Sequence, residues 1–174
     1  MSALGKKIMI VGSGGSGKST LARKLGEILS LPVIHLDKEF WNAGWIETPK
    51  EEWYSKQESL FSGDEWIADG NYGWSMEIRL KRADTLIFLD FNRFVCIYSV
   101  IKRRLINIGK TRPDIAVGCP EKIDFMFLKW LWLFPKKSRP TIIEAISRHR
   151  EMNVIVLKKR HQLTQFLMSI SCTE

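Results

Sequence analysis

One stretch near the start of the chain constrains the fold more than any other. Residues Gly12 to Ser19 read Gly-Ser-Gly-Gly-Ser-Gly-Lys-Ser and match the pattern G-x-x-x-x-G-K-[ST] in full. An apolar run, Lys7 to Val11, precedes this stretch, and an amphipathic stretch, Lys18 to Ser30, follows it, which predicts a strand, a loop and a helix. Successive main-chain N–H groups can turn inward around a phosphate where few Cβ atoms interfere, and the helix N-terminus adds favourable charge. The stretch therefore predicts a phosphate-binding loop after a buried strand.

The residue types in this loop predict its ligand. Lys18 is expected to reach the β- and γ-phosphates of a nucleoside triphosphate, and the hydroxyl of Ser19 is expected to ligate Mg²⁺. The other expected nucleotide-binding residues are Gly12, Ser13, Gly14, Gly15, Ser16, Gly17 and Thr20. A flexible glycine turn is the alternative interpretation, but it leaves the Lys-Ser pair unexplained. We therefore expect ATP and Mg²⁺ as ligands, and since the guanine-reading sequences N-K-x-D and T-K-x-D are absent, a GTPase is not expected.

Apolar runs alternate with helical patterns along the rest of the chain. The further strands are expected at Leu31–Leu36, Glu65–Ala68, Thr85–Leu89 and Asn153–Leu157. The further helices are expected at Pro49–Phe61, after a capping box that begins at Thr48, and at Trp74–Arg82, Asn92–Ile106 and His161–Ile170. This alternation predicts an α/β fold with a parallel sheet covered on both faces. The whole chain, 1–174, is expected to form a single domain, with the strandless basic segment 109–139 inserted as a lid.

Charge is distributed unevenly along the chain. Residues 1–92 contain 11 Lys and Arg against 13 Asp and Glu, whereas residues 93–174 contain 16 against 6. Such a basic half meets polyphosphate, nucleic acid or acidic membrane, or keeps the protein in solution, and charge alone does not distinguish these. The longest apolar stretch, Phe125 to Phe134, is interrupted by Lys129, so no membrane partner is expected. The three cysteines show no C-x-x-C spacing, which favours a reduced, cytoplasmic protein over a zinc or disulfide protein.

Two acidic residues follow predicted strands. Asp37 comes just after the second strand and Asp69 ends the third, and ligands bind at the carboxyl ends of parallel strands. We expect Asp69 to hold Mg²⁺ through water and Asp37 to accept a proton from an attacking hydroxyl. A turn or cap residue is the alternative at both positions. His35 is interpreted as a buried, hydrogen-bonded histidine rather than a pocket residue.

Basic and aromatic residues complete the expected site. Cations that would close over a transferring phosphoryl group are Arg103, Arg104, Lys110 and Arg112. Of these, Arg104 and Arg112 are the expected catalytic pair, and a solvated basic face is the alternative. Tryptophans that would stack on a flat acceptor, with core packing as the alternative, are Trp41, Trp45 and Trp74.

Several of these segments resemble known families. Gly12–Ser19, Asp69-Gly70 and Thr111-Arg112-Pro113 resemble the adenylate-kinase and shikimate-kinase group of small P-loop kinases. A narrower resemblance, to the DNA topology modulation (FlaR-like) proteins, which are related to adenylate kinases, spans nearly the whole chain. It rests on His35-Leu36-Asp37, Trp41, Gly44-Trp45, Asp69-Gly70-Asn71-Tyr72, Thr111-Arg112-Pro113-Asp114 and Gly118-Cys119-Pro120-Glu121.

The resemblance implies a fold and leaves the substrate open. It implies a P-loop NTPase fold of three α/β/α layers, a five-stranded parallel sheet of order 2-3-1-4-5, a lid over the nucleotide and an acceptor pocket between the second and third strands. Adenylate kinases continue the Asp-Gly pair with Phe-Pro-Arg, whereas Asn71-Tyr72-Gly73 stands here. The resemblance therefore does not supply the acceptor.

Two functions follow from the sequence. The first is an ATP-dependent phosphotransferase of adenylate-kinase type, which moves the γ-phosphoryl group with Mg²⁺ to a small-molecule acceptor, a nucleotide or a hydroxylated metabolite. The second is a nucleotide-regulated DNA-binding or DNA topology modulation protein that places its basic half, including Lys136-Lys137-Ser138-Arg139, on DNA phosphates. No helix-turn-helix, zinc-finger or RNA-binding signature accompanies that run, so nucleic acid is the less favoured partner. A monomer and a homodimer are both compatible with the sequence.

Overall fold

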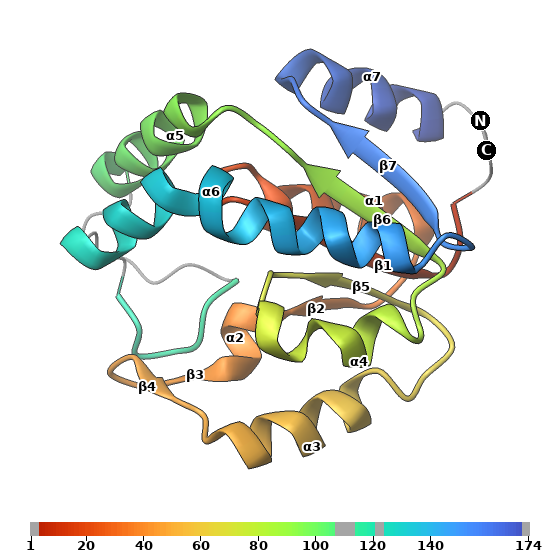
Figure 1. The fold of residues 1–174 in the computed structure, drawn as a ribbon, viewed down its shortest axis with the longest axis horizontal. Coiled ribbons are helices and arrows are strands. Elements are labelled where there is room, and N and C mark those ends of the chain that lie inside the picture. Colours follow the sequence, from red (N-terminus) through yellow and green to blue (C-terminus); the bar gives the residue numbers. More distant parts are fainter. Residues whose placement is uncertain (1–3, 107–113, 121–123, 172–174) are drawn as a thin grey trace.

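The computed structural model describes residues 4–106, 114–120 and 124–171, and its centre is a five-stranded parallel sheet (Figure 1). The strands lie in the order β2-β5-β1-β6-β7. Their bounds are β1 (Lys7–Gly12), β2 (Val33–His35), β5 (Trp66–Asp69), β6 (Thr85–Leu89) and β7 (Asn153–Leu157). Counted along the chain, this order is 2-3-1-4-5, so the expected α/β class and strand order are confirmed.

Helices connect the strands, and one small hairpin extends from the sheet. The helices are α1 (Lys18–Leu29), α2 (Leu36–Phe40), α3 (Lys50–Leu60), α4 (Met76–Leu80), α5 (Arg93–Ile106), α6 (Phe125–Arg148) and α7 (Arg160–Ser171), with a single 3-10 turn, η1 (Gly73–Ser75). The hairpin pairs β3 (Trp41–Asn42) with β4 (Ile46–Glu47) in antiparallel fashion. None of the helices in the described part of the chain combines the length and apolarity that a membrane crossing requires.

The sheet is buried on both faces because its strands alternate their side chains between two apolar clusters. On β1, Met9 and Val11 belong to the cluster that α3, α4 and α6 complete, whereas Ile8 and Ile10 belong to the cluster that α1, α5 and α7 complete. Figure 1 shows α6 in front of the sheet and α1 behind it. This three-layer arrangement brings the carboxyl ends of β1, β2 and β5 to one edge of the sheet.

The structure differs from the expectation after the second strand. That strand ends at His35, and Leu36–Phe40 form the short helix α2, so Asp37 lies on a helix and not in a turn. The expected capping box does not form, because the N-cap of α3 is Pro49 and the hydroxyl of Thr48 donates to the carbonyl of Phe40, 2.5 Å away. The hairpin β3–β4 was not expected. Its strands are too short to produce an alternating pattern.

The expected lid, 109–139, divides in the structure. Residues 107–113 and 121–123 lie outside the described residues, and residues 125–139 are the first part of α6, which begins with Asp124 accepting a hydrogen bond from the N–H of Phe127 at 2.7 Å. The buried side chains of Leu131 and Phe134 fasten this part of α6 to the rest of the fold. The apolar run therefore packs within the chain along one side, although Phe125 and neighbouring side chains on the other side are exposed.

Candidate functional site

The loop between β1 and α1 has a backbone that side chains would disturb. Gly12, Gly15 and Gly17 have φ angles of 149°, 75° and 97°, in the region that favours glycine. A Cβ atom on Gly12 would lie 2.6 Å from the carbonyl oxygen of Leu89, on the strand next to the loop. Glycine is therefore required both by conformation and by close packing at the back of the loop.

The front of the loop has unused capacity for hydrogen bonds. Helix α1 begins at Lys18, and its N-cap, Gly17, supplies no side-chain cap for the first turn. The hydroxyl of Ser16 is buried, and within the part of the chain that the structure describes it has no hydrogen-bond partner. A buried polar atom without a partner is costly, and an anion at the positive end of α1 would satisfy it. These features fit a phosphate group.

Lys18 extends back across the loop. Its Nζ atom donates to the carbonyl of Ser13 at 3.0 Å. Burial lowers the pKa of Lys18, and the nearby carboxylates of Asp37 and Asp69 oppose that shift. A phosphate in the loop would favour the charged ammonium in the same way, so the lysine and an anionic ligand would stabilise each other.

Asp69 connects the loop with the second strand. Its Oδ2 atom accepts a hydrogen bond from the Ser19 hydroxyl at 2.7 Å, and its Oδ1 atom forms a short contact with Nδ1 of His35. The parallel register places His35 directly beside Asp69, and Asp69 directly beside Ile10 of β1. A hydroxyl and a carboxylate are the oxygen ligands that Mg²⁺ prefers, so Ser19 and Asp69 fit the donor set of the metal that accompanies a nucleoside triphosphate. His35 holds the carboxylate in this orientation.

Asn71 holds the loop by a pair of hydrogen bonds. Its Oδ1 atom accepts from the N–H of Gly12 at 3.0 Å, and its Nδ2 atom donates to the carbonyl of Gly12 at 2.8 Å. Arg79 of α4 donates in turn to the carbonyl of Asn71 at 2.6 Å and to Oε1 of Gln57 on α3 at 2.5 Å. Arg79 is fully buried, and this burial lowers its pKa to about 9.

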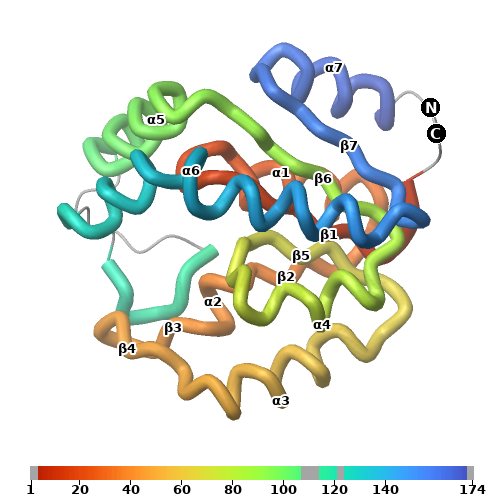
Figure 2. The backbone as a smooth tube through the Cα atoms, in the orientation of Figure 1, coloured from red at the N-terminus to blue at the C-terminus, as the bar shows by residue number. Residues whose placement is uncertain are grey.

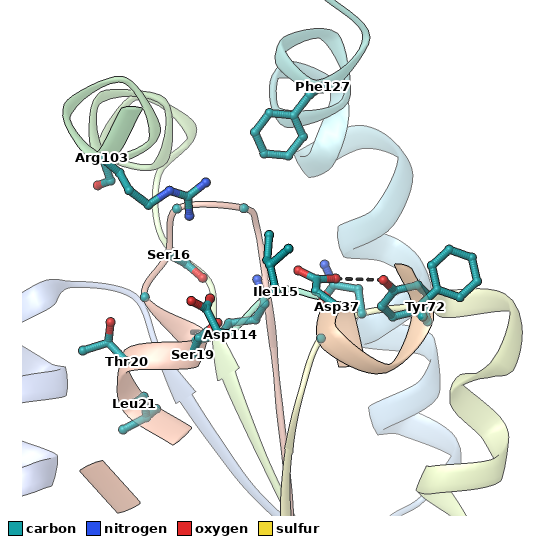
Figure 3. Close-up of a pocket in the computed structure, with 18 of the residues that line it drawn as sticks. Ser16, Ser19, Thr20, Leu21, Asp37, Tyr72, Arg103, Asp114, Ile115 and Phe127 are labelled. Carbon is teal, nitrogen blue, oxygen red and sulfur yellow. Dashed lines mark hydrogen bonds between the residues drawn. The ribbon is translucent and has the colours of Figure 1, made fainter. Parts of the chain in front are cut away.

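A cavity of about 1300 Å³ opens in front of the loop. Figure 3 shows Asp37 pointing into it from α2, with the hydroxyl of Tyr72 donating to Oδ1 of Asp37 at 2.8 Å. Burial, together with the Asp37 carboxylate, raises the pKa of the Tyr72 phenol, which therefore remains a donor. Asp37 thus lies within the same cavity as Lys18 and Ser19, held by a neutral hydroxyl.

The two ends of the cavity differ in chemistry. One end is lined by α1, α5 and α7 and carries the arginines Arg23, Arg103 and Arg160. The other end is lined by α2, the hairpin and η1 and carries the expected tryptophans Trp41, Trp45 and Trp74. The expected loop residues from Gly14 to Thr20 line the same cavity, and the last three of them begin α1.

The expected lid cations are only partly brought to this cavity. Arg103 lines it, and Figure 3 shows the Arg103 guanidinium reaching from α5 toward the loop. Arg104, its neighbour on α5, is not among the described residues that line the cavity. Lys110 and Arg112 lie outside the described residues. The catalytic roles of Arg104 and Arg112 therefore stay predictions, and Arg103 is the arginine that the geometry favours.

The fold is similar to solved structures of small-molecule kinases. Shikimate kinase from Acinetobacter baumannii in complex with shikimate matches with a TM-score of 0.57 at 16% identity, covering 95% of this chain and 94% of that chain. A gluconokinase from Sinorhizobium meliloti 1021 matches with a TM-score of 0.54 at 13% identity, covering 97% of this chain and 92% of that chain. The chain has the P-loop kinase fold.

Sequence comparison adds nothing to this likeness. No protein-family model matches the sequence, and no curated protein sequence matches it. The structural neighbours support the broader resemblance to small P-loop kinases of adenylate-kinase-like fold. The narrower resemblance to the DNA topology modulation proteins stays a prediction.

Several residues of the site were not expected to belong to it. Asn71, Tyr72 and Arg79 contribute through hydrogen bonds between separate elements, and no local pattern predicts such bonds. The sequence does place Asn71 just after Asp69-Gly70 at the end of a predicted strand, where ligands bind, but this position does not identify Gly12 as its partner. Arg139, expected as part of a basic run, instead forms two hydrogen bonds with the Asp90 carboxylate, at 2.8 and 2.9 Å.

Proposed function

We propose that this protein is an ATP-dependent phosphotransferase that moves the γ-phosphoryl group to a hydroxyl or phosphate of a small molecule. One observation carries the proposal: the loop with Lys18 and Ser19, whose hydroxyl donates to Asp69, shares one cavity with the Asp37 carboxylate. A phosphoryl donor and an acceptor could therefore lie in the same cavity. The similarity of the fold to small-molecule kinases supports the proposal.

The loop and the end of the cavity that carries Arg23, Arg103 and Arg160 would bind the nucleotide. The main-chain N–H groups of the loop, the Ser16 hydroxyl and the Lys18 ammonium would hold the triphosphate. Ser19 and Asp69 would hold Mg²⁺, which supplies positive charge against the developing charge of the transferring group. Arg103 would approach the same group from α5, and Arg112 is proposed to do so from the lid.

Asp37 would activate the acceptor. A carboxylate within hydrogen-bond reach of an acceptor hydroxyl accepts its proton as the oxygen attacks phosphorus. The hydrogen bond from Tyr72 fixes the carboxylate in the wall of the cavity. Catalysis of this kind depends on positioning and on charge neutralisation, so it needs no protein nucleophile.

The test is ATP consumption over a panel of acceptors. ADP release is measured with nucleosides, nucleoside monophosphates, sugar acids and other hydroxylated molecules, using the wild type, Lys18→Ala and, as a matched control, Lys81→Ala. Lys81 is an exposed lysine that does not line the cavity. We expect acceptor-dependent ADP release from the wild type and from Lys81→Ala, and a loss of roughly a hundredfold or more in Lys18→Ala. Equal ADP release from Lys18→Ala and the wild type would contradict the proposal.

A further inference from the structure

Aromatic rings from separate elements line one end of the cavity, the end formed by α2, the hairpin β3–β4 and η1, which we call the acceptor end. The rings that line it are those of Phe40, Trp41, Trp45, Tyr72 and Trp74. Trp41 and Trp45 meet edge to face with ring centroids 5.4 Å apart, and Phe40 and Tyr72 lie 4.8 Å apart. Three of these residues, Phe40, Trp41 and Tyr72, also pack on the core, but Trp74 is 44% exposed. Packing alone therefore does not account for the whole wall.

Two of the rings are held by unfavourable backbone conformations. Among the described residues, those other than glycine with positive φ are Ser30, Trp45 and Tyr72. Ser30 ends α1, where such a conformation is common, but Trp45 (φ 65°) and Tyr72 (φ 41°) both line the acceptor end. Glycine or asparagine would adopt these angles at lower cost. Strain of this kind collects at ligand sites, which indicates that the two rings are kept for a ligand.

Hydrogen bonds to the segment 114–120 hold the hairpin that carries Trp45. The indole N–H of Trp45 donates to the carbonyl of Pro120 at 3.2 Å, and the N–H of Gly44 donates to the carbonyl of Gly118 at 3.0 Å. Figure 2 shows the hairpin beside the segment 114–120, although the two are far apart in sequence. The ring of Trp45 is therefore presented to the cavity in one orientation, as a stacking platform requires.

The described charges at this end do not suit an anionic acceptor. Among the lining residues of α2, the hairpin and the start of α3, the charged side chains are two carboxylates, Asp37 and Glu47, and one ammonium, that of Lys50, which lies 5.9 Å from the centre of the Trp74 ring. Phosphates and carboxylates are usually bound by arginine, but the arginines among the described lining residues belong to α1, α5 and α7. Arg79, the arginine of α4, is fully buried and donates to Gln57 and Asn71.

We propose that the phosphoryl acceptor is an uncharged molecule that combines a flat π-electron ring with a hydroxyl group, as a nucleoside or a hydroxymethyl-substituted heterocycle does. The ring would stack against Trp45 and its aromatic neighbours, and the hydroxyl would face Asp37. The oxygen of that hydroxyl forms a bond to the γ-phosphorus of ATP while the bond to the β-γ bridging oxygen breaks, and the hydroxyl proton passes to Asp37. This inference rests on the proposed function and names its acceptor class.

The first test compares acceptors that differ in one property. ADP release and direct binding are measured for nucleosides and hydroxymethyl heterocycles, for the matching nucleoside 5′-monophosphates, for sugar acids, and for free ribose as a hydroxylated molecule without a π ring. We expect kcat/KM to be highest, by roughly tenfold or more, for the uncharged ring-bearing molecules. A preference for the monophosphates, the sugar acids or ribose would overturn the acceptor class and leave the kinase proposal intact.

Two further results separate the inference from the proposed function. ATP binding without binding or turnover of any ring-bearing neutral molecule overturns the acceptor class alone. Absence of ATP binding overturns the proposed function itself. Each outcome is read on the unmodified protein, so none depends on whether a variant folds.

The second test changes the ring of Trp45. Trp45→Phe keeps an aromatic face, Trp45→Leu removes it, and Trp132→Leu removes an exposed tryptophan of α6 that does not line the cavity. We expect Trp45→Leu to raise KM for the acceptor by roughly tenfold to a hundredfold, and Trp45→Phe by only a few fold, because each base–aromatic stack contributes strongly to binding. KM for ATP should stay within about twofold in all three variants. An unchanged acceptor KM in Trp45→Leu, or an equal rise for Phe and Leu, would overturn the stacking role.

Discussion

Asn71 fixes the phosphate-binding loop at the scale of a single residue. Its side-chain amide satisfies both the N–H and the carbonyl of Gly12, as a neighbouring strand would. Asn71→Ala would leave both buried groups without partners, so we expect a loss of about 1 to 3 kcal/mol in the free energy of unfolding and a severalfold higher KM for ATP. Urea unfolding and steady-state kinetics measure the two effects.

The matched control for this change is Asn42→Ala. Asn42 is exposed, and its amide donates to Thr48 over 3.3 Å, so its loss should cost less than about 0.5 kcal/mol. Equal stability of Asn71→Ala and Asn42→Ala would show that Asn71 does not hold the loop.

Because of Arg79, we expect the free energy of unfolding to depend on pH in the alkaline range. Its pKa is about 9 in the folded protein, well below the ordinary arginine value, so between these two values the unfolded chain binds more protons. Stability due to this residue therefore rises with pH across that interval and is lost as the pH falls through about 9. Relative to Arg79→Met, the free energy of unfolding of the wild type should increase by up to about 1.4 kcal/mol per pH unit once the pH exceeds the folded-state pKa of Arg79.

Urea unfolding of both proteins between pH 8 and about 10.5 measures this difference. Arg82→Met is the control. Arg82 is exposed, so the difference in free energy of unfolding between Arg82→Met and the wild type should not change with pH across the same range. If the difference in free energy of unfolding between the wild type and Arg79→Met does not change with pH, the buried guanidinium keeps its ordinary pKa.

At the residue scale, the sequence predicts what a local pattern determines. The spacing from Gly12 to Ser19 is sufficient to place a phosphate-binding loop, because all the required residues lie in one short continuous segment of the sequence. The bonds of Asn71 and Arg79 join three separate elements, and nothing in their own neighbourhood in the sequence indicates these partners. Their roles depend on the tertiary arrangement.

At the scale of elements, α6 shows why a proline-rich segment is hard to interpret. The helix runs through Pro135 and Pro140, each of which lacks the N–H that an interior helical position uses. The sequence pattern therefore favours a break, and the segment was expected to be part of a lid. Burial of Phe134, Ile142 and Ala145 against the sheet offsets the lost hydrogen bonds. The apolar contacts of the whole helix outweigh its local propensity.

The short elements α2 and β3–β4 were missed for a different reason. A helix of five residues and strands of two residues are too short for the repeats by which helical and strand patterns are recognised. Positive φ at Gly44 is compatible with a turn, but at Trp45 it is a conformation that a bulky residue rarely adopts. The acceptor end of the cavity is built from these elements, so it was the part of the site least accessible to prediction.

One ion pair fastens α6 to the end of β6. Arg139 forms two hydrogen bonds to the Asp90 carboxylate, through Nε at 2.8 Å and Nη2 at 2.9 Å, and this interaction raises the pKa of Arg139. We expect Arg139→Ala to reduce the free energy of unfolding by about 1 to 2 kcal/mol, because Asp90 would keep a half-buried charge without its partner. Arg139→Lys should restore roughly half of that loss, since lysine keeps the charge without the fork.

Urea unfolding again provides the measurement, and Lys136→Ala, which removes an exposed charge from the same helix, is the control. A loss in Lys136→Ala as large as that in Arg139→Ala would show that the net charge of α6, and not the pair, sets its stability.

At the scale of the whole molecule, the parallel sheet explains how distant residues form one site. Gly12, His35 and Asp69 end three adjacent strands, so they meet at one edge although the chain separates them widely. The alternation of strands and helices predicts this edge, but the order of the strands was implied only by the resemblance to small P-loop kinases. Both the edge and the order are found in the structure.

The uneven charge of the sequence does not divide the cavity between the two halves of the chain. The basic second half contributes Arg103 and Arg160 to the described lining, but it also contributes Asp114 and Asp124. The first half contributes the carboxylates Asp37 and Glu47 together with four cations, Lys18, Arg23, Lys24 and Lys50. Net charge along the sequence therefore does not predict the charge of this cavity.

The central claim is that the start of α1 binds the triphosphate of ATP. Isothermal titration calorimetry of ATP in excess Mg²⁺ tests it most directly, with the wild type, Lys18→Ala and Lys81→Ala compared at one salt concentration. The account predicts one ATP per chain in the wild type and in Lys81→Ala, and an affinity at least roughly tenfold weaker in Lys18→Ala. Absence of ATP binding to the wild type, or equal affinity in all three proteins, would contradict it.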